Sequence, residues 1–197
     1  WQKWSAFEHV LQFFDNWTLG RYLHTVSNKR SLRPTRRLKT DHQANDQEFV
    51  TRHWLALERA MAWLAGHAQA EDALLHQGAF TDWADTIARQ GKVLYTNVIY
   101  WKALHEMGQA AGTLGMPEEA NLYAHQARVV RDSIQSHFWR QHLGYFVTSQ
   151  VFENLSSSGN LLAIAWGLTS PEQSHRILDT MRYFGMESPV PTKAVHR

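Results

Sequence analysis

Apolar residues recur at intervals of three and four along most of the chain, which is the spacing of one face of an amphipathic helix. The clearest pattern covers residues 95–114, and a second pattern of the same kind covers residues 117–138. Gly115 is suited to end the first helix, and Pro117 is suited to the first turn of the second. Because the connection is so short, we predict that the two helices are antiparallel neighbours. Their apolar faces consist of Tyr100, Leu104, Met107, Ala111 and Leu114, and of Ala120, Tyr123, Ala127, Val130, Ile134 and Phe138.

The same periodicity predicts further helices on both sides of this pair. The last of them starts with a capping box, in which Ser170 is the cap, Pro171 takes the first helical position and Gln173 completes the box. Between the helices, stretches rich in Gly, Pro, Ser or charged residues predict loops. The further helices cover residues 8–26, 47–64, 160–168 and 171–183, the loops cover 29–46, 70–79, 156–159 and 186–197, and a short extended stretch covers 144–147.

This order of elements predicts an all-α protein built from successive antiparallel hairpins. Strands and helices do not alternate, so a nucleotide-binding α/β fold is not expected. The 197 residues are compatible with a single domain over residues 1–197. With 44% hydrophobic residues and nine Trp, the chain has enough apolar material for a sizeable core.

Composition and motifs exclude several classes of site. The net charge of +2 gives no argument for a nucleic-acid partner, and the basic stretch over residues 29–39 is interpreted as a solvated loop. There is no cysteine, and none of the twelve histidines has the spacing of a zinc site. Glycine-rich phosphate loops are absent, and no apolar run has the length of a membrane span. We therefore expect no metal, no cofactor, no nucleic acid and no membrane partner.

The segment Asp82-Trp83-Ala84-Asp85 carries the clearest candidate chemistry. Its two carboxylates flank a Trp, and Arg89, Tyr95 and Asn97 follow shortly after it. Cleavage of a glycosidic bond needs one carboxylic acid that protonates the leaving oxygen and a second carboxylate that activates water or attacks carbon. A neighbouring Trp would supply a stacking face for a sugar ring and a lower local dielectric, which favours the protonated form of an acid.

A purely structural interpretation of the same segment stays open on these residues alone. Asp82 can cap a helix that begins at Trp83, and Asp85 can be a first-turn acid favoured by the helix dipole. The two interpretations overlap, because Asp82 can be the cap even where Asp85 is catalytic.

Residues 82–104 resemble the central stretch of the amylo-α-1,6-glucosidase-like enzymes, which are the glucosidase domain of glycogen debranching enzymes and their bacterial relatives. The likeness spans roughly residues 47–193, and the first of the ordered phrases that carry it is Asp82-Trp83-Ala84-Asp85. It implies a six-hairpin glycosidase fold, an (α/α)6 barrel whose long loops at one end form the sugar pocket. The further phrases that carry it are Gly91-Lys92, Tyr95-Thr96-Asn97, Phe138-Trp139, Gly144-Tyr145-Phe146, Gly159-Asn160-Leu161-Leu162 and Pro189-Val190-Pro191-Thr192-Lys193.

The resemblance also implies roles for single residues. Asp85 matches the position of the general acid of an inverting hydrolase. The family's base lies well toward the C-terminal end of the barrel, beyond Arg197, and Glu153 is the candidate base inside this chain although its phrase does not match. The N-terminal part departs from the family, with only a partial match at Phe14-Asp15-Asn16-Trp17. Candidate substrate-binding residues, by their places in the motif, are Asp82, Trp83, Arg89, Tyr95 and Asn97.

We therefore predict an inverting glycoside hydrolase that acts on a carbohydrate with an α-glucosidic bond. The chain begins at Trp1 rather than Met and stops at Arg197 just after a loop, so we expect a fragment of a larger barrel, that is, a partial (α/α)6 barrel. The alternatives are another six-hairpin glycosidase of the trehalase, invertase or mannosylglycerate-hydrolase kind, and a helical scaffold or carbohydrate-binding piece without catalysis. The absence of cysteine allows a reducing compartment, and we expect a cytoplasmic location. The oligomeric state is not indicated.

Replacement of the predicted proton donor tests this assignment. We expect Asp85→Asn in the full-length protein to abolish hydrolysis while leaving the fold intact, because the amide cannot supply the proton that the leaving oxygen needs. Activity on an α-linked glycoside and circular dichroism of the two proteins measure the two effects. Near-normal turnover by the variant would contradict the assignment.

Overall fold

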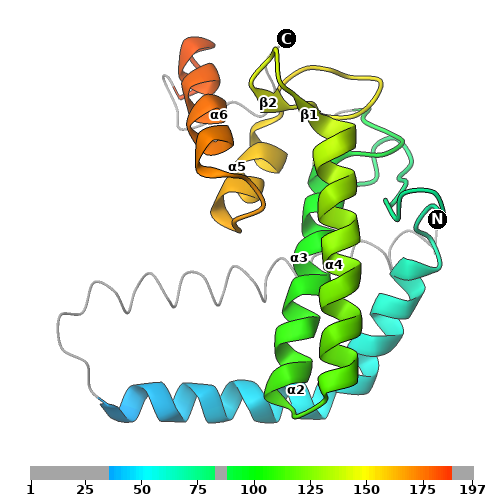
Figure 1. Ribbon diagram of the computed structural model, residues 1–197, viewed down its shortest axis with the longest axis vertical. Helices are drawn as coiled ribbons and strands as arrows, with labels where there is room; N and C mark the ends of the chain where they lie inside the picture. The colour runs from blue at the N-terminus through cyan, green and yellow to red at the C-terminus, as the bar shows by residue number, and fades with distance from the viewer. Residues whose placement is uncertain (1–35, 83–87, 188–197) are drawn as a thin grey trace. The chain divides into compact units, whose positions relative to one another are not determined.

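The computed structural model describes residues 36–82 and 88–187, with the backbone alone for residues 36–46 and residue 49 (Figure 1). The described chain is mostly helical, as the periodicity predicts. The helix predicted over residues 8–26 lies outside the described residues. The elements are α2 (Arg36–Ala65), α3 (Leu94–Thr113), α4 (Pro117–Phe138), β1 (Trp139–Arg140), β2 (Tyr145–Phe146), α5 (Ser157–Ala165) and α6 (Pro171–Tyr183).

Elements with strong local signals lie where the sequence predicts them. The pair α3 and α4 is joined by a turn at Gly115, whose φ of +74° suits a glycine. The capping box of α6 is also confirmed, because the Ser170 side chain accepts a hydrogen bond from Gln173 N and the Gln173 side chain accepts one from Ser170 N. The extended stretch predicted over residues 144–147 is confirmed as β2, which pairs antiparallel with β1, Trp139 opposite Phe146 and Arg140 opposite Tyr145.

Two of the predicted loops are wrong in part. α2 begins at Arg36, so most of the predicted loop over residues 29–46 is helical. Arg, Leu, Lys, Gln and Ala in this stretch are good helix formers, and a run of positive charge does not by itself prevent a helix. α5 begins at Ser157 rather than Asn160, because Ser156 takes the extended conformation of an N-cap residue and its successors continue as helix.

The chain divides into two compact units, and the described part of the first comprises residues 36–66 and 103–125. Its core joins α2 to the C-terminal part of α3 and the N-terminal part of α4. The rings of Trp54 and Tyr123 meet edge to face, with centroids 6.4 Å apart. Burial, together with the nearby charges of Glu58 and Glu119, raises the pKa of Tyr123. The buried apolar residues of this unit include Val50, Trp54, Leu57, Met61, Leu64, Leu104, Met107, Ala111 and Tyr123.

The described part of the second unit comprises residues 67–82, 88–102 and 126–187. It contains the N-terminal part of α3, the C-terminal part of α4, the small sheet, α5, α6 and the irregular segment that precedes α3. Short bridges between single residues tie this segment together, at Ala68 with Leu75, Gln77 with Gly91, and Val93 with Ser149. The largest apolar side chains that are fully buried here are Leu74, Leu75, Leu94, Ile134, Phe138, Phe146 and Leu155.

Two buried asparagines fix the first turns of α3 and α5 in the same way. Asn97 accepts a hydrogen bond from Leu75 N at 2.7 Å and donates to Leu75 O and to Val93 O, four residues before it. Asn160 accepts a hydrogen bond from Phe146 N at 3.0 Å and donates to Phe146 O and to Ser156 O, again four residues before it. Each side chain therefore imitates a strand partner for a residue that precedes its helix.

The start of α5 also packs closely against the start of α3, at Gly159. A Cβ at this position would come within 2.7 Å of Leu94 Cδ2, 2.9 Å of Leu94 Cγ and 3.3 Å of Tyr95 N. Only a glycine lets the two helix ends approach this closely without displacing Leu94.

A pair of glycine substitutions tests this close approach. We expect Gly159→Ala to lower the free energy of unfolding of the full-length protein by about 1–3 kcal/mol, because the added methyl overpacks the contact with Leu94. Gly112→Ala is the matched control, since nothing lies within 4 Å of a Cβ there. We expect this control to stabilise the protein by about 0.5–1 kcal/mol, as alanine does in a helix. Denaturant unfolding measures both, and equal effects would contradict the close approach.

Candidate functional site

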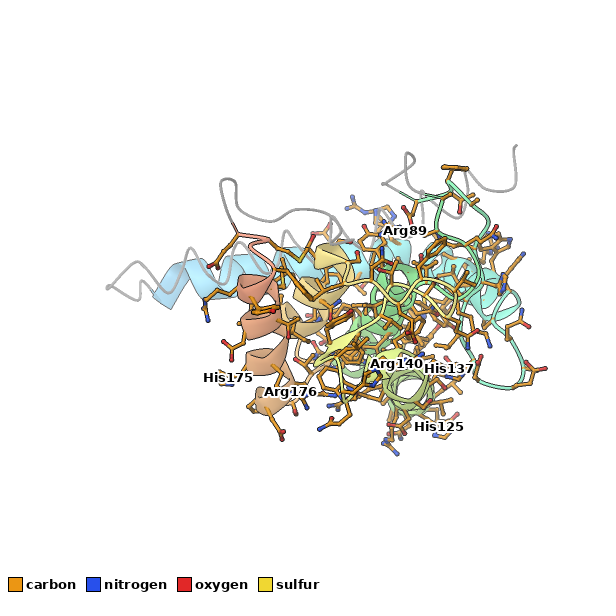
Figure 2. All side chains as sticks on the ribbon, turned by 90° about the horizontal axis from the view of Figure 1, so that it is seen from above. Arg89, His125, His137, Arg140, His175 and Arg176 are labelled. Atoms are coloured by element: carbon orange, nitrogen blue, oxygen red, sulfur yellow. The ribbon has the colours of Figure 1, made fainter. Side chains whose placement is uncertain are left out.

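A buried ion pair between Asp82 and Arg89 forms the centre of the candidate site. Arg89 Nε donates to Asp82 Oδ2 at 2.7 Å and Arg89 Nη2 donates to Asp82 Oδ1 at 2.8 Å, so the pair is bidentate. Arg89 is 1% exposed and Asp82 is 9% exposed. Figure 2 labels Arg89 and shows it well apart from Arg140 and His137 of the same unit. The two charge-assisted hydrogen bonds of such a bidentate pair are strong, and removing either partner leaves an uncompensated buried charge.

Gln77 connects the ion pair to the first turn of α3. Its side-chain nitrogen donates to Asp82 Oδ2 at 2.9 Å, and its side-chain oxygen accepts a hydrogen bond from the Thr96 hydroxyl. The backbone of Gln77 exchanges two hydrogen bonds of 2.9 Å with Gly91. Gly91 has a φ of +81°, a conformation that glycine adopts without strain. The two ends of the segment that contains Asp82 and Arg89 are thereby held together.

The guanidinium of Arg89 also reaches the starts of both helices. It lies 5.4 Å from the centroid of the Tyr95 ring in the first turn of α3, which is within the range of a cation–π contact. Its Nη1 lies 3.5 Å from the Ser156 hydroxyl at the N-cap of α5, and that hydroxyl lies 3.2 Å from the hydroxyl of Ser158. One side chain thus links the segment before α3 with the N-terminal ends of α3 and α5.

A second cluster of charges holds the preceding segment to α4. Asp72 Oδ2 lies 2.5 Å from Lys92 Nζ and 2.9 Å from His137 Nε2, and Asp72 Oδ1 accepts a hydrogen bond from Leu74 N at 3.1 Å. Burial alone would raise the pKa of Asp72. The hydrogen bonds from Lys92 and Leu74 and the charges of Lys92 and His137 outweigh burial, so its pKa is lowered. The cluster therefore keeps an ionised carboxylate at the end of α4.

The described part of the chain has neither a candidate metal site nor a helix that could cross a membrane. Within residues 36–82 and 88–187, no group of three or more His, Cys, Asp or Glu side chains is placed to hold a metal ion. None of the helices in these ranges combines the length and the apolar character that crossing a membrane requires. The expected cytoplasmic location stays a prediction.

The sequence and the fold both match known glycosidases. Residues 39–187 match the family described as the bacterial alpha-L-rhamnosidase 6 hairpin glycosidase domain. The chain belongs to this family. The predicted membership of the six-hairpin glycosidase superfamily is thereby confirmed, while the family that matches is that of rhamnosidases rather than glycogen debranching enzymes. No curated protein matches the sequence.

Solved structures of rhamnosidases share the fold. A rhamnosidase from Klebsiella oxytoca with rhamnose bound aligns with a TM-score of 0.60 and 14% identity, over 76% of this chain and 28% of that chain. A GH78 family rhamnosidase of Bacillus sp. GL1 aligns with a TM-score of 0.60 and 21% identity, over 75% of this chain and 16% of that chain. At these identities the likeness concerns the fold. This member of the family therefore spans less than a third of the length of either rhamnosidase.

The structure brings three of the predicted site residues of this rhamnosidase-family domain together. Asp82, Arg89 and the half-buried Tyr95 belong to one network. Asn97 is fully buried, and its side chain is engaged with backbone groups of Leu75 and Val93. Trp83 and the predicted acid Asp85 lie outside the described residues, as does the helix predicted to start at Trp83.

Glu153 lies in a different environment from the network around Arg89. Its side chain is 61% exposed, and its Oε1 lies 3.2 Å from Arg140 Nε. Its backbone oxygen accepts a hydrogen bond from the Tyr145 hydroxyl at 3.0 Å. Burial, together with the charge of Glu153, raises the pKa of Tyr145. The role of Glu153 as a base stays a prediction.

Sequence reasoning missed three members of the network: Gln77, Thr96 and Ser156. Gln77 and Ser156 lie in stretches whose composition predicts only a loop. Thr96 lies inside the motif that carries the family resemblance, but its residue type alone indicates no function. Ser156 is 67 positions from Arg89 along the chain, so no local pattern joins them. The signal that could have found Thr96 is its position one residue before Asn97 on the buried start of a helix.

The buried ion pair gives a testable stability difference. We expect Asp82→Asn and Arg89→Met each to lower the free energy of unfolding by about 3–5 kcal/mol, because each leaves the other charge buried without its partner. The double variant should cost less than the sum of the two. Arg182→Met is the control, since Arg182 and Asp179 form an exposed pair at 2.9 Å whose loss costs about 0–1 kcal/mol. A loss at Arg89 no larger than at Arg182 would contradict a buried pair.

Proposed function

We propose that this chain is part of a glycoside hydrolase that cleaves α-L-rhamnosidic bonds. The match of residues 39–187 to the rhamnosidase six-hairpin domain carries the proposal. A similar structure, the rhamnosidase from Klebsiella oxytoca, has rhamnose bound. The substrate is therefore proposed to be a carbohydrate with a terminal rhamnose, and the described helices are proposed to be part of an (α/α)6 barrel.

The contacts of Asp82 support a division of labour in the segment with two carboxylates. Both oxygens of Asp82 accept hydrogen bonds from Arg89, and one of them accepts a third from Gln77. A carboxylate held in this way serves as an acceptor and is poorly suited to deliver a proton to a leaving group. Asp85 therefore remains the proposed proton donor of this segment. The ion pair of Asp82 with Arg89 is proposed to hold the ends of the segment in place.

The proposed mechanism inverts the configuration at the anomeric carbon. An acid protonates the leaving oxygen while a second carboxylate activates water on the opposite face of the sugar ring, and the two carboxyl groups are about 6.5–9.5 Å apart. We propose that the C-terminal part of the barrel supplies this second carboxylate. Glu153 is the less suitable candidate, because its side chain is exposed and contacts Arg140. Arg89, Tyr95, Asn97 and Trp83 are proposed to shape the pocket.

A second substrate class has one observation in its favour. The phrase from Asp82 to Leu104 resembles amylo-α-1,6-glucosidase-like enzymes, which favours an α-glucosidic bond. Both classes share the six-hairpin architecture, and a fold of this kind does not fix the sugar. The family model that matches is that of rhamnosidases, so the rhamnoside is proposed first.

Hydrolysis of a small panel of glycosides by the full-length protein tests the proposal. We expect 4-nitrophenyl α-L-rhamnoside to be cleaved with a higher kcat/KM than the α-D-glucoside, and NMR of the early product to show the inverted anomer. The Asp85→Asn variant serves as the inactive control. Preference for the glucoside would move the assignment to the second class. Release of the retained anomer would reject the inverting mechanism, and cleavage of neither would reject the proposed function.

A further inference from the structure

Phe80 combines two properties that oppose each other. Its backbone has a φ of +59°, which is strongly unfavourable for a bulky side chain, and its side chain gains little from burial because the residue is 55% exposed. Most of the other large apolar residues with high exposure, such as Leu122 and Tyr183, lie on helices with ordinary backbone angles. Neither the backbone nor the packing of the described residues explains why a phenylalanine occupies this turn.

The turn that carries Phe80 is flanked by hydrogen bonds on both sides. The hydroxyl of Thr81 donates to Gly78 O at 2.7 Å, which closes the turn. Before the turn, Gln77 is paired with Gly91 through its backbone. After it, Asp82 is fixed by the bidentate pair with Arg89. These contacts offset the unfavourable angle at Phe80, and they leave the aromatic ring presented from a fixed point.

Phe80 lies at the same end of the unit as the candidate site. It is two residues before Asp82, and the segment it belongs to is tied to the first turns of α3 and α5 through Gln77, Thr96 and Arg89. A fixed, exposed ring beside a polar network is the arrangement that a sugar site needs. Such a ring packs on the apolar C–H face of a pyranose, and the buried network beside it holds the turn in place.

We infer that Phe80 is a carbohydrate-contact residue that stacks on the apolar face of a bound sugar ring. The inference rests on the proposed function and deepens it by naming a specificity residue of the same site. The strained backbone is retained because the ring is used in binding, as strain is at other functional positions. A glycine at residue 80 would remove the strain and the sugar contact together.

The stability of the Phe80→Gly variant separates this role from internal packing. Glycine adopts a φ of +59° without penalty, so a ring that contacts only ligand predicts a higher thermal midpoint for Phe80→Gly than for the wild-type full-length protein. A ring that packs against another part of the protein predicts a lower midpoint. A lower midpoint would overturn the inference, whatever the kinetics.

Substrate kinetics give the second readout. We expect Phe80→Gly to raise KM for the cleaved glycoside, and to weaken binding of the free sugar in ligand-observed NMR, by about three- to tenfold, the factor expected for loss of one aromatic contact. Phe80→Trp keeps an aromatic ring and should stay within about twofold of the wild type. Tyr183→Ala, which removes an 84% exposed aromatic residue on α6, is the control and should change neither quantity.

The outcomes distinguish the two proposals. Wild-type hydrolysis with an unchanged KM and unchanged sugar binding in Phe80→Gly overturns the role of Phe80 and leaves the glycosidase proposal standing. Binding of L-rhamnose or D-glucose that Phe80→Gly weakens, in a wild-type protein without turnover, supports Phe80 and rejects the proposed hydrolysis. A wild-type protein that neither binds nor cleaves these sugars rejects both.

Discussion

The buried pair of Asp82 and Arg89 is the constraint on which the candidate site depends. Removing two charges from water costs several kcal/mol for each ion, and only well-aligned partners offset that cost. Here the partners come from Gln77, from Tyr95 in the first turn of α3 and from Ser156 at the cap of α5. The segment before α3 can therefore take this conformation only when both helix ends are already in place, which couples the local shape of the site to the fold of the unit.

Two buried asparagines hold the N-terminal ends of α3 and α5 in place by hydrogen bonds to the backbone. Asn97 and Asn160 each bind both backbone groups of one earlier residue and the carbonyl four residues before themselves. The same device thus occurs in two consecutive hairpins, which fits an architecture built from repeated hairpins. Gly159 adds a steric condition, since a side chain there would meet Leu94. Hydrogen bonding fixes each helix start, and close packing fixes one start against the other.

Sequence reasoning succeeded where the signal was local and failed where it was not. The capping box at Ser170 and the short connection before Pro117 are each encoded within a few residues, so α3, α4 and α6 could be predicted. The start of α2 differs from the prediction because the run of positive charge and Pro34 favour a loop, while the residues that follow are good helix formers. The contact of Arg89 with Ser156 joins positions 67 apart, and only the folded chain brings them together.

The same contacts limit which residues can carry the chemistry of the family. Asp82 and Asn97 have the residue types of catalytic or sugar-binding groups, yet the described contacts use both to hold the backbone and the ion pair in place. Polar side chains that hold the fold in this way cannot rearrange during a reaction, because moving them would leave buried groups without hydrogen-bond partners. In this proposal the supporting residues shape the pocket, and direct contact with the sugar is made by residues that they hold in place. Phe80 meets that condition, since its turn is fixed on both sides while its ring is exposed.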